Sequence, residues 1–182
     1  RIWKKQIALN IIKEISAEKG QARDETKTLS QSPPSLFDLT SLQREANNRF
    51  GFSAKNTVGL AQALYDKHKL ITYPRTDSKF LPEDYVNTVR ETIKSLKSLT
   101  GFQEHCSEAL KLSLVHDKHK VFNNKKVSDH FAIIPTGINQ LKLSEPELKL
   151  YDLIVKRFLG AFFPAAKYLN TKRITSVKDY LF

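Results

Sequence analysis

The stretch of this chain best suited to chemistry is residues 70–78, Leu-Ile-Thr-Tyr-Pro-Arg-Thr-Asp-Ser. Proline at position 74 has no backbone N–H, so the short β-prone run before it must end there. We expect Tyr73 to present its hydroxyl at the end of an element, beside the Arg75 guanidinium, which pairs well with phosphate. A tyrosine can act as a covalent nucleophile, and a phosphodiester is a suitable target. The same residues also fit a half-buried core tyrosine next to a solvated arginine.

A second candidate lies in residues 128–136, where a polar loop enters an apolar segment at His130. A histidine there can donate a hydrogen bond to a phosphate oxygen or tune a nearby tyrosine. The alternative is a structural histidine that is bonded to the backbone or to a neighbouring acid. The residue types alone leave both readings open.

The overall charge indicates the kind of partner. Thirty Lys and Arg residues against 19 Asp and Glu give the 182-residue chain a formal net charge of +11. Such a balance favours a polyanionic partner. Nucleic acid is favoured over a membrane, because no apolar run approaches the roughly 18 residues that a span requires. The single cysteine, Cys106, excludes an internal disulfide and a cysteine-based zinc site, and it fits a reducing cytoplasm.

Other side chains could add contacts to nucleic acid. Lys79 could contact a DNA backbone or be a solvated lysine. Arg44 and Arg49 could line a DNA path or lie on a solvated helix face. Tyr65 and Phe80 could stack on bases, or pack in the core. A basic patch suited to phosphates, or else a mobile solvated hairpin, is formed by Lys118, Lys120, Lys125 and Lys126.

These groups must be positioned by a chain that reads as mainly helical after residue 36. Apolar periodicity predicts five helices, and the last, over about 145–162, should bury Leu148 together with Tyr151 and Phe158. The signals for helix starts are an N-cap serine, a proline in a first turn and two capping-box spacings, at Ser53, Pro82, Thr40–Gln43 and Ser144–Glu147.

The remaining segments are less regular. Residues 2–15 could form a strand or a helix, and residues 16–35 read as a loop or domain connector. A small hairpin is predicted around residues 121–127, and β-prone residues alternate with polar ones after Pro164. Because the chain lacks methionine, starts at Arg1 and ends at Phe182 in a β-prone run, we expect it to be a piece of a larger protein.

Tyr73-Pro-Arg-Thr-Asp-Ser78 resembles the nucleophile motif of the type IA DNA topoisomerases. The resemblance covers roughly residues 32–163. The proline after the tyrosine and the Ile-Ile-Pro-Thr ending at Thr136 are more like the topoisomerase III branch. Four further segments resemble the family and occur in the family's order, at residues 33–43, 49–55, 60–65 and 128–136.

The resemblance implies an α+β multidomain fragment, in which a helical tyrosine-bearing domain is inserted in an incomplete β-rich domain. Residues 1–35 would belong to the β-rich arch domain and its connector. Residues 36–163 would form the catalytic-tyrosine domain, and residues 164–182 would be the return strands of the arch.

The resemblance also implies a reaction and its residues. Tyr73 would attack single-stranded DNA and form a 5′-phosphotyrosyl link, with Arg75 stabilising the phosphorane and His130 contacting the scissile phosphate. Fixed donors aimed at developing charge are effective in such sites. Lys79 stands where members of the family often have arginine. This chain departs from many topoisomerase III-like sequences at Phe131, which takes the place of a second histidine, so any role of that second ring is in doubt.

The family's Mg²⁺ is held by an acidic cluster in a separate N-terminal domain, and this chain has no Asp-x-Asp pattern. We therefore expect these residues to bind no metal and to be inactive in isolation. His116 and His119 have an i, i+3 spacing, but no cysteine or acidic cluster completes a site. The expected setting of the intact protein is a monomer acting on single-stranded DNA in the bacterial cytoplasm, at the nucleoid.

Two other classes of protein compete with this reading. A tyrosine recombinase would form the opposite 3′-phosphotyrosyl link, but it uses several scattered arginines and a late tyrosine in a different context. A non-catalytic basic helical DNA-binding module fits the charge, yet it gives no reason for the Tyr73 and His130 motifs to occur together.

Overall fold

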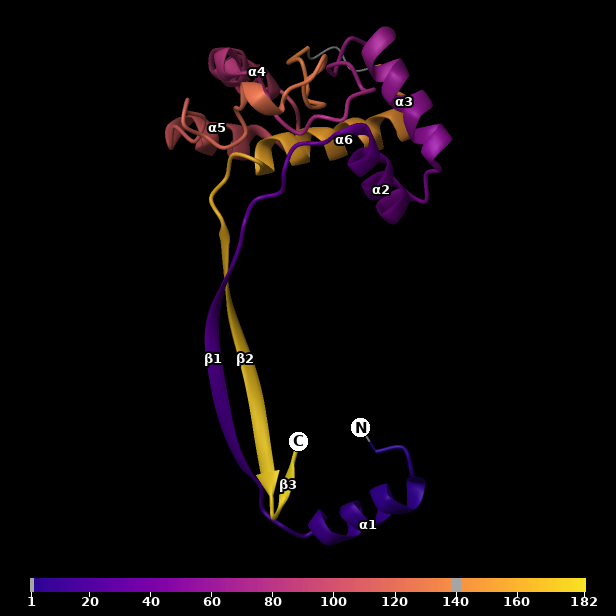
Figure 1. The fold of residues 1–182 in the computed structure, drawn as a ribbon, viewed down its shortest axis with the longest axis vertical. Helices are drawn as coiled ribbons and strands as arrows, with labels where there is room; N and C mark the ends of the chain where they lie inside the picture. Colours follow the sequence, from indigo (N-terminus) through magenta and orange to yellow (C-terminus); the bar gives the residue numbers. More distant parts are fainter. Residues whose placement is uncertain (1, 139–141) are drawn as a thin grey trace. The chain divides into compact units, whose positions relative to one another are not determined.

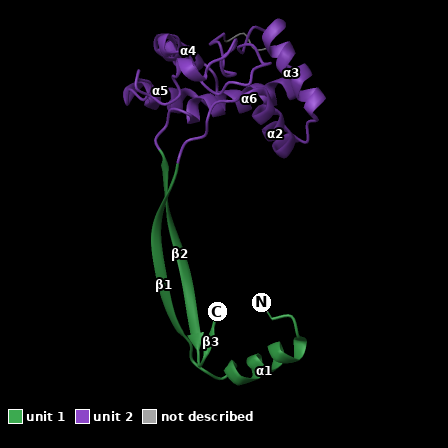
Figure 2. Ribbon diagram, in the orientation of Figure 1, with its two compact units in different colours: residues 1–31, 165–182 green, residues 32–164 purple. Residues whose placement is uncertain are grey.

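The computed structural model describes residues 2–138 and 142–182, which divide into two compact units (Figure 1, Figure 2). Unit 1 comprises residues 1–31 and 165–182, and unit 2 comprises Ser32–Pro164. Among the described residues there are six α-helices and one three-stranded sheet, which confirms the α+β class. None of the described helices has both the length and the apolar character needed to cross a membrane.

Unit 1 contains one helix and the whole sheet. The first segment, left open by its sequence, forms helix α1 (Lys5–Ile15). The strands are β1 (Gln21–Gln31), β2 (Ala166–Val177) and β3 (Tyr180–Leu181), in the antiparallel order β1-β2-β3. The β-prone pattern after residue 164 is thus confirmed. The prediction of a loop over residues 16–35 was wrong at residues 21–31, which form β1. The strand was missed because every one of its residues is exposed, so its sequence does not alternate apolar and polar residues.

The core of unit 2 is formed by helices and by the loops between them. The helices are α2 (Leu39–Phe50), α3 (Ala54–Asp66), α4 (Val86–Leu96), α5 (Gln103–Lys111) and α6 (Glu145–Gly160). Helix α6 runs through the middle of this unit and packs against α2, α3 and α5 (Figure 1). As predicted, Tyr151 and Phe158 of α6 are buried, whereas Leu148 is exposed and was wrongly placed in the core.

Side-chain caps determine where several helices begin. Ser53 accepts a hydrogen bond from the backbone of Asn56 and caps α3, and Ser144 forms a capping box with Glu147, both as predicted. The predicted box at Thr40 was wrong. Asp38 caps α2 instead, and its carboxylate accepts the backbone N–H of Ser41 at 2.7 Å. The backbone of Asp38 is extended, as is typical of an N-cap residue, and α2 therefore begins at Leu39, one residue before Thr40.

Two 3₁₀ turns complete the unit, η1 (Glu83–Tyr85) and η2 (Asn124–Lys126). The second lies where a hairpin was predicted, and that prediction was wrong. The side chain of Asn123 accepts the backbone N–H of Lys125, which closes a tight turn in place of a strand.

Candidate active site

The two segments singled out from the sequence run side by side in unit 2. The backbone N–H of Thr72 donates to the carbonyl of Ile134 at 2.9 Å, and the N–H of Ala132 donates to the carbonyl of Phe80 at 3.0 Å. Ile71 and Pro135 form an antiparallel β-bridge next to the first of these contacts. The pairing brings residues far apart in the sequence to one place.

The pairing places the rings of Tyr73 and His130 against each other. Their centroids are 4.2 Å apart, with 42° between the ring planes. Both rings line a cavity of about 450 Å³, together with Tyr65, Thr72 and Phe131 among others. Tyr73 is half-buried and His130 is exposed, so a large substrate can reach both from solvent.

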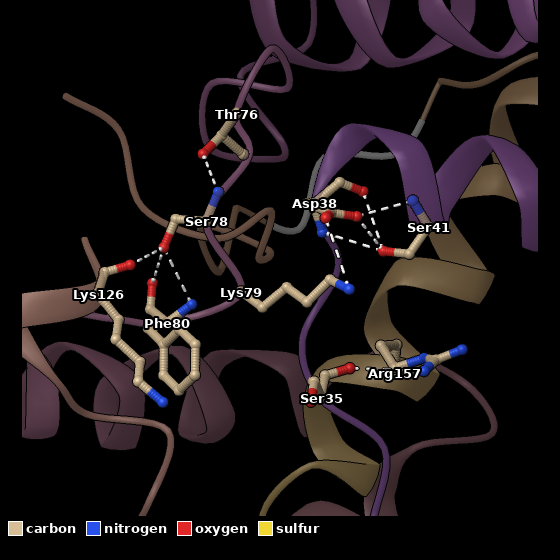
Figure 3. A network of polar contacts seen from close by, with 9 residues as sticks. All are labelled: Ser35, Asp38, Ser41, Thr76, Ser78, Lys79, Phe80, Lys126 and Arg157. Atoms are coloured by element: carbon tan, nitrogen blue, oxygen red, sulfur yellow. Dashed lines mark hydrogen bonds and ion pairs between the residues drawn. The ribbon is translucent and has the colours of Figure 1, made fainter. Parts of the chain in front are cut away.

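Two buried hydroxyl side chains hold the loop that follows Tyr73 (Figure 3). The hydroxyl of Thr76 accepts the backbone N–H of Ser78 at 3.1 Å, and it donates to the carbonyl of His130, also at 3.1 Å. The hydroxyl of Ser78 donates in turn to the carbonyl of Lys126 at 2.9 Å and accepts the N–H of Phe80 at 3.2 Å. This loop has no regular secondary structure, yet its backbone is tied to the His130 segment.

Arg75 is exposed and directed toward helix α3. Its Nε donates to Oε1 of Gln62 at 3.3 Å. Gln62 lies one turn before Tyr65 on the same helix, and residues at i and i+3 share a helix face. Arg75 does not line the cavity beside Tyr73. No carboxylate of the described residues pairs with its guanidinium, which leaves that charge available to an anion.

Of the other candidate contacts to nucleic acid, Tyr65 lines this cavity, whereas the basic side chains do not. Lys79 pairs with Asp38, the cap of α2, with Nζ and Oδ2 3.6 Å apart (Figure 3). Arg44 is exposed, and Arg49 pairs with Glu45 at 2.6 Å. The structure therefore joins Tyr73 with His130, directs the Arg75 guanidinium toward helix α3, and does not bring Lys79 into the cavity.

Phe131, the residue that departs from the family pattern, packs its ring against Tyr85 at 4.7 Å between centroids. Its side chain thus lies between the cavity and the core. The rings of His116 and His119 are 5.7 Å apart. Within residues 2–138 and 142–182, no group of three or more His, Cys, Asp or Glu side chains could hold a metal ion.

Sequence reasoning missed the residues that support the candidate nucleophile. Gln62 was not singled out, and neither was Thr72, whose hydroxyl donates to the carbonyl of Ala132 and accepts the N–H of Ile134, both at 2.9 Å. The recurrence of hydroxyl residues at Thr72, Thr76 and Ser78 could have indicated Thr72, since buried hydroxyl groups must find partners. No local signal marks Gln62, because its contact with Arg75 is tertiary.

The arrangement suits attack on a phosphate ester. A phenol hydroxyl is available at the edge of a cavity, an imidazole lies against its ring, and a guanidinium stands two residues away in the chain. Among the described residues, no hydrogen bond engages the His130 ring, so that ring can bind an incoming group.

A family model described as DNA topoisomerase matches residues 1–182. The chain is 41% identical over 180 residues to DNA topoisomerase 3 of Bacillus subtilis, which covers 97% of this chain and 24% of that protein. It is 48% identical over 152 residues to DNA topoisomerase 3 of Bacillus licheniformis, covering 82% of this chain and 21% of that protein.

Among solved structures, the full-length topoisomerase I of Thermotoga maritima matches with a TM-score of 0.65 over 98% of this chain and 28% of that chain. The identity is 24%, so this likeness shows the fold. The chain spans about a quarter of the length of these relatives.

Proposed function

This chain belongs to the DNA topoisomerase family, and on that premise we propose that it carries the nucleophile of an enzyme that cuts and rejoins one DNA strand. The observation that carries the proposal is the contact between Tyr73 and His130, 4.2 Å apart at one cavity. A basic module that only binds DNA has no need for a phenol and an imidazole brought together by two paired segments.

In the proposed reaction the Tyr73 oxygen attacks a backbone phosphorus of single-stranded DNA. A Tyr–O–P bond forms while the P–O3′ bond breaks, which leaves a 5′-phosphotyrosyl link and a free 3′-hydroxyl. The phenol gives up its proton and the departing 3′ oxygen takes one up. Religation reverses each step, and because one phosphate ester replaces another, the change in DNA topology needs no ATP.

Three side chains assist in this proposal. Arg75 stabilises charge on the five-coordinate phosphorus. Its Nε donates to Gln62, and no carboxylate of the described residues pairs with its terminal nitrogens. His130 donates a hydrogen bond to the scissile phosphate or tunes the Tyr73 hydroxyl. Lys79 binds the DNA backbone outside the cavity, next to its ion pair with Asp38.

The family implies Mg²⁺, but the described residues of this chain do not fit a metal site, because they bring no three ligand side chains together. The proposal places the ion in a part of the parent protein outside these residues, and no step here passes through it. We expect the chain alone to be inactive, and the parent to act as a monomer in the bacterial cytoplasm, on nucleoid DNA.

The test uses the full-length parent protein, Mg²⁺ and a single-stranded oligonucleotide labelled at either its 5′ or its 3′ end, with detergent to trap covalent adducts. The matched control is Tyr73→Phe, which keeps the ring contacts and removes only the hydroxyl. We expect the 3′-labelled fragment alone to become attached to the protein, and no adduct with Tyr73→Phe.

The other outcomes contradict the proposal in distinct ways. Attachment of the 5′-labelled fragment alone would indicate the 3′-phosphotyrosyl chemistry of a recombinase. An adduct that persists in Tyr73→Phe would show that another residue is the nucleophile. DNA binding without any adduct would leave a non-catalytic binding module.

A further inference from the structure

Unit 2 has a second pocket, of about 480 Å³, which shares no lining residue with the cavity beside Tyr73. Four lysines line it, Lys79, Lys118, Lys120 and Lys126. They come from the loop after Tyr73 and from the segment around η2, the basic patch noted in the sequence. The fold therefore gathers this patch around a concave surface.

The positive charge of this lysine pocket is largely uncompensated. Asp117 is the one carboxylate in its described lining. Lys79 pairs with Asp38, but no carboxylate of the described residues lies within ion-pair distance of the other three lysines. Burial and the neighbouring cations lower the pKa of His119, which also lines the pocket, so the lysines supply the charge at neutral pH.

The pocket also has an aromatic wall. The Nζ of Lys126 lies 4.7 Å from the centroid of the Phe80 ring, a cation–π contact that orients the ammonium group (Figure 3). Ser78 bonds to the backbone of both residues and, through Thr76, to the backbone of His130. This wall is therefore anchored to the same loop that presents Tyr73.

We propose that the lysine pocket binds the phosphodiester backbone of a nucleic-acid strand, as a second contact site next to the tyrosine cavity. Lysines spread around a volume of this size suit successive phosphates better than a single free anion, and an adjacent aromatic ring suits a strand with exposed bases. The inference concerns equilibrium binding and does not depend on Tyr73 being the nucleophile.

The test measures binding of a short fluorescent single-stranded oligonucleotide to the full-length parent over a range of salt concentrations. All proteins carry Tyr73→Phe so that no covalent step intervenes. The double variant Lys118→Gln/Lys126→Gln is compared with Lys97→Gln/Lys111→Gln, which removes two exposed lysines outside the pocket. Both variants lose the same charge, so general electrostatic attraction changes equally.

The slope of log K against log salt is negative, and each lost phosphate contact makes it shallower by about 0.7 for a single strand. We therefore expect the pocket variant to bind more weakly, with a slope smaller by about 1.4, and the control to keep the slope of the parent. Equal changes in both variants, or none in either, would overturn the proposal. Inorganic phosphate, tested as competitor at constant ionic strength, must not displace the strand; displacement from the parent but not from the pocket variant would show a free-anion site instead.

Discussion

The ring of Tyr65 meets the ring of Tyr73 nearly edge-on, with centroids 5.4 Å apart and 79° between their planes. One turn earlier on the same helix, Gln62 holds the guanidinium of Arg75. Helix α3 therefore positions both the candidate nucleophile and its neighbouring cation, although neither belongs to that helix. The first two predictions follow from this double contact.

Replacing Tyr65 should impair DNA cleavage without removing DNA binding. Aromatic contacts of this geometry contribute about 0.5–1.5 kcal/mol beyond area burial, so Tyr65→Ala should slow single-turnover formation of the covalent adduct by about two- to tenfold. Tyr65→Phe keeps the ring and should restore the rate. If Tyr65→Ala lowers only the melting temperature and leaves the adduct rate unchanged, Tyr65 has no positioning role.

Arg75→Ala should reduce DNA relaxation by the parent protein by about 10²–10³-fold, the usual cost of removing a fixed donor to a transition state. Gln62→Ala keeps the guanidinium and frees only its Nε, so it should cost much less. Relaxation assays on both variants make the comparison. A rate that Arg75→Ala leaves unchanged would remove this residue from the mechanism, and equal losses would point to a defect in α3.

Thr76 should contribute strongly to stability. Thr76→Val keeps the shape of the side chain but leaves the carbonyl of His130 and the N–H of Ser78 without the hydroxyl. An unsatisfied buried polar group costs about 1–3 kcal/mol, so a loss of at least about 2 kcal/mol is expected for the pair, with Thr76→Ser costing less. Urea unfolding measures both variants. Equal stability of Thr76→Val and the parent would show that water or a shifted backbone satisfies these groups.

Glu147 should make folding stability depend on pH. Hydrogen bonds from the side chain and backbone of Ser144, and then the interaction with His68, hold the pKa of Glu147 below its ordinary value of 4.5, although burial opposes them. A carboxyl whose pKa is depressed in the folded state stabilises that state above its unfolded pKa, and this contribution disappears as pH falls through the lower folded pKa.

The stability difference between the parent and Glu147→Gln should therefore be constant above about pH 5 and shrink below pH 4.5. Chemical unfolding at a series of pH values measures it. Glu104→Gln, in an exposed part of α5, serves as the control, and a similar trend with this variant would mean that general charge repulsion is responsible.

Most of the helices in unit 2 could be predicted from the sequence, because α3, α4 and α6 each bury one side and repeat their apolar residues with a helical period. Strand β1 could not, since it pairs only with β2 and buries neither face, which removes the period-two signal. The start of α2 was placed at the wrong cap because Asp38 and Thr40 both have side chains suited to an N-cap.

The candidate site was predicted only in part. Tyr73, Arg75 and His130 were identified as residues, but their arrangement depends on hydrogen bonds between segments far apart in the chain. Local periodicity contains no information on such pairs. The direction of Arg75 toward Gln62 is likewise a tertiary contact, and so is the packing of Phe131 on Tyr85.

The loop after Tyr73 has neither helix nor strand, and residues 60–100 contain no glycine that would act as a hinge. The amide protons of Ser78 and Phe80 are nevertheless bonded to buried hydroxyl groups, and that of Leu81 to the carbonyl of Val121, so the exchange of these three with solvent should be as slow as that of helical amides. A DNA end attached at Tyr73 would be tethered to a rigid anchor. The rate at which this end meets the other cut end would then depend on the motion of the surrounding domains and not on motion of the loop.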